Sequence, residues 1–154
     1  MAERGGVPIP VEKDGAIVTK GDAEGFKLAR QLLEEFGLPL GLLPLAGVIE
    51  MGYVPSTGYI WVLQEKKRLH NFKLVNRLAT YDVEIHGYIE KGRIKKLKGV
   101  KVKELTMWPP IFEVYVDDDD QAGMIHFKSL AGITKSFPVE AFALPLEAEE
   151  ISTL

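Results

Sequence analysis

The first clear pattern along the chain is an apolar stripe with helical spacing. Apolar side chains recur three and four positions apart at Ala23, Phe26, Ala29, Leu32, Leu33 and Phe36. This period places them on one face of an α-helix. Asp22 is a residue type that caps helix starts, and Gly37 followed by Pro39 is a typical helix end. We therefore predict a helix over residues 22–36.

The next segment, residues 38–47, is the most apolar of the chain. Its two prolines and two glycines are incompatible with a regular helix or a central strand. We therefore expect a hydrophobic loop, for which two interpretations stay open. In the first, the loop closes one end of the core. In the second, it forms an exposed lip that contacts lipid or a partner, because exposed apolar patches usually mark contacts.

From Val48 onward apolar and polar residues alternate, which is typical of strands. Residues 48–53 and 59–65 are predicted strands joined by a turn at Pro55–Gly58. Both faces of the second strand are apolar, so we expect it to be buried on both sides. Residues 69–78 are ambiguous but alternate in part as a strand would. Further strands are predicted over residues 81–90, 111–116, 124–130 and 133–139.

Residues 93–108 form a long predicted extended segment whose apolar phase slips. Ile94, Val100 and Val102 fall on even positions, whereas Leu97 falls on an odd one. One extra residue reverses the two faces of a strand, so these slips indicate β-bulges or a break at Gly99.

About seven short strands with closely spaced turn signals predict a mainly β fold, an antiparallel β-barrel-like or sandwich domain preceded by the one amphipathic helix. The chain of 154 residues has the length of a single domain with its own core. Residues 1–21, rich in glycine and proline, predict a flexible arm. Residues 22–144 form the predicted globular domain, and residues 145–154 a predicted acidic, flexible tail.

Composition narrows the function classes only slightly. The net charge of −3 argues against bulk attraction to nucleic acid, and the chain has no cysteine for disulfides or thiolate chemistry. The first ten residues do not have the pattern of a signal peptide, and no apolar run is long enough for a transmembrane helix. We expect a cytoplasmic protein, or one peripheral to an internal membrane.

Residues 91–103 carry seven cations within thirteen positions. They are Lys91, Arg93, Lys95, Lys96, Lys98, Lys101 and Lys103. One interpretation is a solvated strand face, partly paired with acidic residues of a neighbouring strand. The other is a patch for anionic lipid head groups or an anionic membrane surface, to which each cation contributes about 1 kcal/mol. Nucleic acid is not expected as a partner, because the patch has little arginine and few interleaved aromatic residues.

The aromatic residues either form only a packed core or line a pocket for an apolar small molecule inside the barrel. On the second interpretation a lipid or other apolar ligand is the expected partner. The candidate ligand- or lipid-binding residues are Lys95, Lys96, Lys98, Lys101, Leu40, Leu42, Leu43, Trp61 and Trp108.

The chain has no pattern that indicates catalysis, a metal or a cofactor. Its histidines, His70, His86 and His126, do not have metal-ligand spacing. The acidic run Asp117–Asp120 lacks the glycine and glutamate positions of a calcium loop, so it is predicted to be a solvated hairpin loop. Phosphate-loop, dinucleotide-binding, nucleophile-elbow and zinc-protease motifs are absent. We therefore predict no catalytic residue, no metal ligand and no cofactor.

Several segments, in their order along the chain, resemble a known family. They are LPLGLLPL from Leu38, Gly52-Tyr53 before Thr57-Gly58, Ile89–Gly92, Lys98–Leu105, Trp108, and Ser136–Phe142. Over residues 22–144 the chain is similar to the plant family called domain of unknown function 538, most of all to a subgroup with a role in leaf-hair (trichome) development. Pro109-Pro110 departs from the family pattern, in which relatives more often continue as a strand.

This resemblance implies a plant protein with a β-barrel-like domain after a helix, and roles in growth, trichome development or stress response. The family has been likened to bactericidal/permeability-increasing proteins, which implies lipid binding, and it supplies no established catalytic residues. The leading hypothesis is thus a non-enzymatic binding domain for an apolar or lipid-like ligand. The alternatives are a protein-interaction or scaffold module without a small ligand, and a hydrolase with an unrecognised site.

Overall fold

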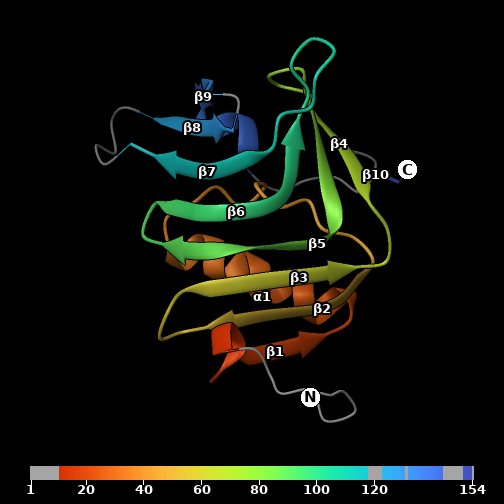
Figure 1. Cartoon of the computed structure of the whole chain (residues 1–154), viewed down its shortest axis with the longest axis vertical. Helices are drawn as coiled ribbons and strands as arrows, with labels where there is room; N and C mark the ends of the chain where they lie inside the picture. Colours follow the sequence, from red (N-terminus) through yellow and green to blue (C-terminus); the bar gives the residue numbers. More distant parts are fainter. Residues whose placement is uncertain (1–10, 118–122, 131, 144–150, 154) are drawn as a thin grey trace.

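The computed structural model describes residues 11–117, 123–130, 132–143 and 151–153. These residues form one antiparallel sheet and one α-helix, α1 (Asp22–Glu35) (Figure 1). The strands are β1 (Ile17–Lys20), β2 (Val48–Val54), β3 (Tyr59–Gln64), β4 (Arg68–Phe72), β5 (Arg77–Glu90), β6 (Arg93–Val102), β7 (Ile111–Val116), β8 (Met124–Ser129), β9 (Thr134–Pro138) and β10 (Ile151–Thr153). Two short 3₁₀ helices, η1 (Val11–Lys13) and η2 (Val139–Phe142), complete the described elements. The prediction of a mainly β domain with one α-helix is confirmed, although strand β1 comes before the helix in the chain.

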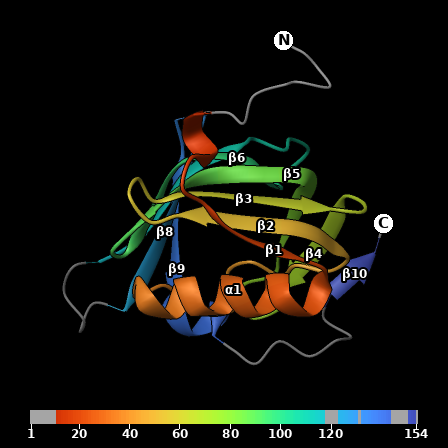
Figure 2. The ribbon, with the colours of Figure 1, turned by 90° about the horizontal axis from the view of Figure 1, so that it is seen from below.

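The sheet is open rather than a closed barrel. Its strands follow the order β1-β2-β3-β5-β6-β7-β8-β9, and within the described ranges no pairing joins β1 to β9. The 14-residue strand β5 is where the sheet branches. Its first residues pair with β4 and its later residues with β3, so that Tyr81 lies opposite Arg68 and Tyr88 opposite Tyr59. This branching bends the sheet around a concave interior (Figures 1 and 2).

The predicted irregularity in the lysine-rich strand is confirmed. The register between β5 and β6 shifts between the pairs Tyr81/Val100 and His86/Lys98, and again before Tyr88/Lys95. Gly99 has a φ of 99°, and a Cβ atom there would lie 2.4 Å from the carbonyl oxygen of Glu84. Only glycine fits this close approach, which places the bulge at the break that the sequence pattern indicates.

Helix α1 lies on one side of the first three strands, while η1 lies on the other (Figure 2). Its buried residues are Gly25, Leu28, Ala29, Leu32 and Leu33. The predicted stripe is thus correct at Ala29, Leu32 and Leu33 but wrong at Ala23, which is exposed. Gly25 also lies on the buried face. A Cβ atom there would lie only 2.6 Å from Val48 Cγ1, so the absence of a side chain lets helix and strand pack closely.

The two ends of α1 differ in how well the sequence predicted them. Asp22 is the first residue of the helix rather than its cap, and its carboxylate accepts a hydrogen bond of 3.1 Å from the backbone N–H of Val48. At the other end the prediction is confirmed: Gly37 has a φ of 73° and its N–H donates to the Glu34 carbonyl. The N–H of Leu38 then reaches back to Leu33 at 2.8 Å, which completes a Schellman-type helix end.

The apolar loop of residues 38–47 closes the core, as the first of its two interpretations expects. Most of its members are buried, namely Leu38, Pro39, Gly41, Leu42, Leu43, Pro44 and Leu45. The N–H of Gly41 donates a 2.8 Å hydrogen bond to the carbonyl of Phe142, which fastens the loop to η2. The alternative of an exposed lip therefore does not describe this segment.

The sheet includes two segments that lie outside the predicted globular range 22–144. Ile17–Lys20, assigned from sequence to the flexible arm, pairs with β2 in register Ile17/Tyr53 to Lys20/Glu50. Ile151–Thr153, assigned to the flexible tail, pairs with β4. Alternation over four or fewer residues is too short to separate from a loop pattern. Residues 1–10 and 144–150 lie outside the described residues, as do Asp118–Asp120 of the acidic run.

Two further predictions concern the burial of β3 and the length of the extended segment that contains β6. β3 is buried on both faces, as predicted, with Ile60, Trp61 and Val62 all buried. The extended segment predicted over residues 93–108 ends earlier, because β6 stops at Val102. Among the described residues, no helix has the length and apolar character needed to cross a bilayer.

Candidate functional site: an apolar pocket with a charged mouth

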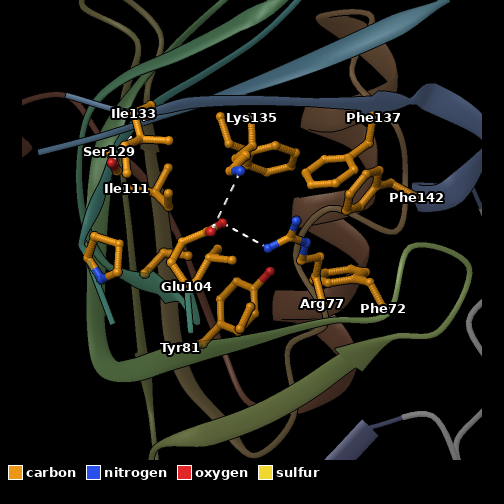
Figure 3. Close-up of a pocket in the computed structure, with 15 residues that line it drawn as sticks. Phe72, Arg77, Tyr81, Glu104, Ile111, Ser129, Ile133, Lys135, Phe137 and Phe142 are labelled. Carbon is orange, nitrogen blue, oxygen red and sulfur yellow. Dashed lines mark hydrogen bonds and ion pairs between the residues drawn. The ribbon is translucent and has the colours of Figure 1, made fainter. Parts of the chain in front are cut away.

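The concave side of the sheet contains a pocket lined mainly by aromatic and aliphatic side chains (Figure 3). β4 to β9, the β6–β7 segment and η2 contribute Phe72, Arg77, Ala79, Tyr81, Val100, Val102, Glu104, Pro109, Ile111, Phe127, Ser129, Ile133, Lys135, Phe137 and Phe142. Most of these residues occupy alternate positions of their strands, such as Ala79 and Tyr81 on β5. Period-two alternation directs them to the same face of the sheet.

One wall of the pocket is a cluster of four phenylalanine rings. Phe142 of η2 lies at its centre, with its ring centroid 4.8 Å from that of Phe72, 5.2 Å from Phe127 and 6.2 Å from Phe137. These tilted and edge-to-face arrangements are the favourable geometries for aromatic pairs. The wall is therefore apolar, well packed and suited to contact with a hydrocarbon surface.

Three charged side chains cross the mouth of the pocket. Arg77 Nη1 lies 2.9 Å from Glu104 Oε1, and Lys135 Nζ lies 3.8 Å from Glu104 Oε2 (Figure 3). The Arg77 guanidinium also lies over the Phe137 ring, at 5.5 Å from its centroid. β5, the β6–β7 segment and β9 each supply one of these residues, so the mouth forms only when distant strands come together. Two cations there hold one carboxylate directly above apolar walls.

Tyr81 of β5 also lines the pocket and anchors the apolar loop to it. Its hydroxyl donates a hydrogen bond of 3.0 Å to the carbonyl oxygen of Leu42 in the apolar loop. Complete burial raises the pKa of the Tyr81 phenol far above its ordinary value, because the buried site disfavours the phenolate. The hydroxyl thus remains a neutral donor at any physiological pH.

The pocket is narrow in this conformation. Its interior space for water-sized molecules is about 30 Å³, which accommodates about one or two waters. Pockets that enclose a drug-sized ligand have volumes of about 300–1,000 Å³. A larger ligand would therefore have to displace part of the wall, and the β6–β7 segment is the part outside the regular strands.

The structure separates most of the predicted binding residues from this pocket. Leu42 and Leu43 are buried in the core and Leu40 is half-buried, while none of the three lines the pocket. Trp61 is buried on the opposite face of β3, where Lys13 of η1 covers its ring at 4.5 Å. Leu42 reaches the pocket indirectly, through its hydrogen bond with Tyr81.

The predicted lysines lie along the outer side of β6, and none of them lines the pocket. Lys95 forms an ion pair with Glu90 at 2.8 Å, and Lys96 lies over the ring of Tyr88. Lys98 is exposed. Lys101 lines a shallow hollow together with another predicted residue, Trp108, and with Lys67, Leu69 and Thr80.

Sequence reasoning missed the three residues at the mouth. Arg77 shows a local signal, because it begins a strand whose next residues include the buried Ala79 and Tyr81. Glu104 and Lys135 show none, since one lies in a lysine-rich segment and the other in a short alternating strand. Their proximity depends on the bend of the sheet, which local patterns do not encode.

A second polar array lies outside the pocket, at His126 of β8. Its Nε2 lies 2.7 Å from Asp117 Oδ1, and its Nδ1 lies 2.6 Å from Ser136 Oγ. The residue types are those of a hydrolase triad, but the two ring nitrogens are exchanged relative to the triad, in which the acid bonds Nδ1 and the serine bonds Nε2. His126 and Ser136 are cross-strand partners in the register of β8 and β9. Ser136 is exposed, and none of the three lines the apolar pocket. The array therefore lacks the enclosed cleft that acyl transfer requires.

The other two histidines lie against aromatic rings. His70 is buried with its ring 4.4 Å from that of Phe72, and His86 lies against Tyr59 at 6.1 Å. Within the described ranges, no three histidine, aspartate or glutamate side chains converge in a way that would hold a metal ion.

Comparison with known proteins identifies a family. A family model with the description "Protein of unknown function, DUF538" matches residues 29–143, which is more than half of the chain. No curated protein and no solved structure matches. The matched range contains the apolar loop, all the pocket-lining residues and the three residues of the mouth.

Proposed function

The chain belongs to the family described as "Protein of unknown function, DUF538", and we propose that it is a non-enzymatic binding domain for an apolar molecule with an anionic head group. The observation that supports this proposal is the position of Glu104 between Arg77 and Lys135 above the aromatic pocket. A carboxylate beside hydrocarbon walls has the chemistry of a fatty acid or of another acidic lipid.

In this proposal Glu104 occupies the place of the ligand's head group. An incoming anion would take over Arg77 and Lys135 while its apolar tail displaces the β6–β7 segment from the phenylalanine wall. Burying a hydrocarbon tail contributes about 0.8 kcal/mol for each methylene group, which can offset the cost of moving this segment. In this proposal the structure described here is the closed state of the pocket, in which the β6–β7 segment fills the space that the tail would occupy.

The biological setting follows from the family resemblance alone. We propose that the protein acts in a plant, in growth, trichome development or stress response, either in the cytoplasm or at the surface of an internal membrane. The binding function proposed for the pocket does not depend on this biological setting.

Binding of a long-chain fatty acid and of its methyl ester, measured by isothermal calorimetry, tests the proposal. We expect the acid to bind and the ester to bind about tenfold more weakly, because the ester cannot form charge-assisted hydrogen bonds with Arg77. Glu104→Gln frees both cations and should strengthen binding of the acid, whereas Arg77→Gln should weaken it. Lys95→Gln, which breaks a surface ion pair with Glu90, is the matched control and should change nothing. Equal binding of acid and ester, or no binding of either, would contradict the proposal.

The main alternative is a protein-interaction module without a small ligand. The space of about 30 Å³ favours it, because a pocket that never opens is simply a core. Absence of fatty-acid binding by both the native protein and Glu104→Gln would select this alternative. The second alternative, a hydrolase, would require ester hydrolysis that Ser136→Ala abolishes, and the array of Asp117, His126 and the exposed Ser136 does not favour it.

A further inference from the structure

Exposed apolar side chains gather on two neighbouring turns at one end of the molecule. Leu74, in the β4–β5 turn, is 78% exposed, and Leu105 and Met107, in the β6–β7 segment, are 92% and 62% exposed. Figure 1 shows both segments projecting from the same end of the sheet. The N–H of Lys103 donates to the Leu78 carbonyl at 2.9 Å, which holds them together. We call residues 73–76 and 103–108 the apolar tip.

The backbone of the apolar tip is strained where it presents Leu105. The backbone N–H and C=O groups of Glu104 and Met107 bond to each other at 2.8 and 2.9 Å, so Leu105 and Thr106 form a two-residue turn. Leu105, the first residue of this turn, has a φ of 57°, a conformation that favours glycine and is costly for leucine. Because its side chain is almost fully exposed, packing within the protein does not offset this cost. A contact between Leu105 and another molecule would offset it.

The charges around the apolar tip indicate which molecule. Residues 73–77 and 103–108 contain Lys73, Arg77 and Lys103, with Glu104 as their single acidic residue, and Glu104 is already paired to Arg77. Lys73 and Lys103 are exposed beside the leucines. Lysine is depleted in protein–protein interfaces, whereas lysine flanking exposed leucine and tryptophan is typical of segments that bind anionic membranes.

We propose that the apolar tip docks on an anionic lipid bilayer, with Leu74, Leu105 and Met107 entering the interface and Lys73 and Lys103 contacting acidic head groups. Trp108, which is 36% exposed, would lie at the level of the head groups, where tryptophan is favoured. Docking in this way would bring the mouth residue Glu104 to the membrane surface. The inference does not require the pocket to bind a ligand, because docking depends only on the exposed turns.

Flotation with vesicles of phosphatidylcholine, with and without phosphatidylserine, tests the proposal. We expect binding only to vesicles that contain phosphatidylserine, with a loss at high salt. Leu105→Asn should weaken binding about tenfold, as removing one inserted leucine predicts. Asparagine tolerates positive φ, so this variant should fold at least as stably as the native protein. Lys103→Glu should weaken binding by a similar factor, since it reverses one charge at the surface.

Matched controls lie elsewhere on the surface. Val83→Thr removes a half-exposed apolar side chain from β5, and Lys98→Glu reverses an exposed lysine of β6. Neither should change vesicle binding. Trp108 emission should shift to shorter wavelength on binding, while the buried Trp61 contributes a constant background.

Failure to float with phosphatidylserine vesicles would overturn the proposal and assign the apolar tip to a protein partner. So would binding that Lys98→Glu abolishes while Leu105→Asn leaves it intact. A protein that floats in this way but binds no fatty acid would refute the pocket function and leave the docking proposal standing.

Discussion

The hydroxyl of Tyr81 donates a hydrogen bond of 3.0 Å to the carbonyl oxygen of Leu42. This bond connects the pocket-lining strand β5 with the middle of the apolar loop, 39 residues earlier in the chain. A loop rich in proline and glycine leaves backbone carbonyls without partners from regular secondary structure, and buried carbonyls need a donor. Tyr81 supplies one while its ring lines the pocket, so the most apolar segment of the chain and the pocket are structurally coupled.

Tyr81→Phe should therefore destabilise the protein although it removes only one oxygen atom. Leaving the buried Leu42 carbonyl without its donor should lower the free energy of unfolding by about 1–3 kcal/mol. Urea denaturation followed by circular dichroism measures this change. Tyr53→Phe, at a half-buried tyrosine of β2, is the control and should lower stability by clearly less. Equal effects of the two substitutions would show that the Tyr81 bond contributes little.

The contact of Gly52 with Trp61 predicts a second sensitive position. A Cβ atom on Gly52 would lie 2.1 Å from the indole ring of Trp61 on the neighbouring strand. Gly52→Ala should lower the free energy of unfolding by about 1–3 kcal/mol, because the ring must move from its packed position. A double-mutant cycle with Trp61→Leu measures the coupling, and most of the loss should disappear in the double variant. Additive effects would place the origin of the loss elsewhere.

Glu50 predicts a dependence of stability on pH. Hydrogen bonds from Lys20 and from the Trp61 indole hold the pKa of Glu50 below its ordinary value of 4.5, against the opposing effect of burial. A carboxyl with a lowered pKa in the folded state stabilises the protein above its unfolded pKa, and this contribution is lost as the pH falls through the folded pKa. Glu50→Gln should therefore lower the free energy of unfolding by about 1 kcal/mol at neutral pH.

The difference between native protein and Glu50→Gln should shrink as the pH falls below about 4.5, the unfolded value. Thermal unfolding over a pH series measures it. Glu84→Gln, at an exposed glutamate of β5, is the control for loss of one surface charge. A difference that is constant at all pH values would mean that the Glu50 charge does not contribute.

Much of the fold could be predicted because its elements carry local signals. α1 combines helical periodicity with a glycine at its C-terminal end, and β3 has two apolar faces. Each element can therefore be predicted from its own residues. β1 was missed because Ile17 and Val18 are both largely exposed and the strand has only four residues. The bend of β5 and the openness of the sheet depend on which strands pair, and alternation does not specify pairing partners.

The candidate site was less predictable for the same reason. Seven cations in one segment suggest a binding patch, yet along β6 Lys95 pairs with Glu90 and Lys96 lies over the ring of Tyr88. Arg77, Glu104 and Lys135 are ordinary charged residues in the sequence and become notable only where three separate segments meet. Long-range contacts of this kind require the folded structure.

The lysine row of β6 provides a final prediction, at its bulge. Lys96 has a φ of 53°, a conformation that costs a residue with a side chain about 1–2 kcal/mol and glycine almost nothing. Lys96→Gly should therefore raise the free energy of unfolding, by up to about 1 kcal/mol once the greater freedom of glycine in the unfolded chain is subtracted. Lys98→Gly is the matched control, because Lys98 is an equally exposed lysine of the same strand with φ outside the positive range. It should lower stability by about 0.5–1 kcal/mol. Urea denaturation of the two variants should give shifts of opposite sign, and a loss of stability in both would mean that the bulge does not hold Lys96 in this conformation.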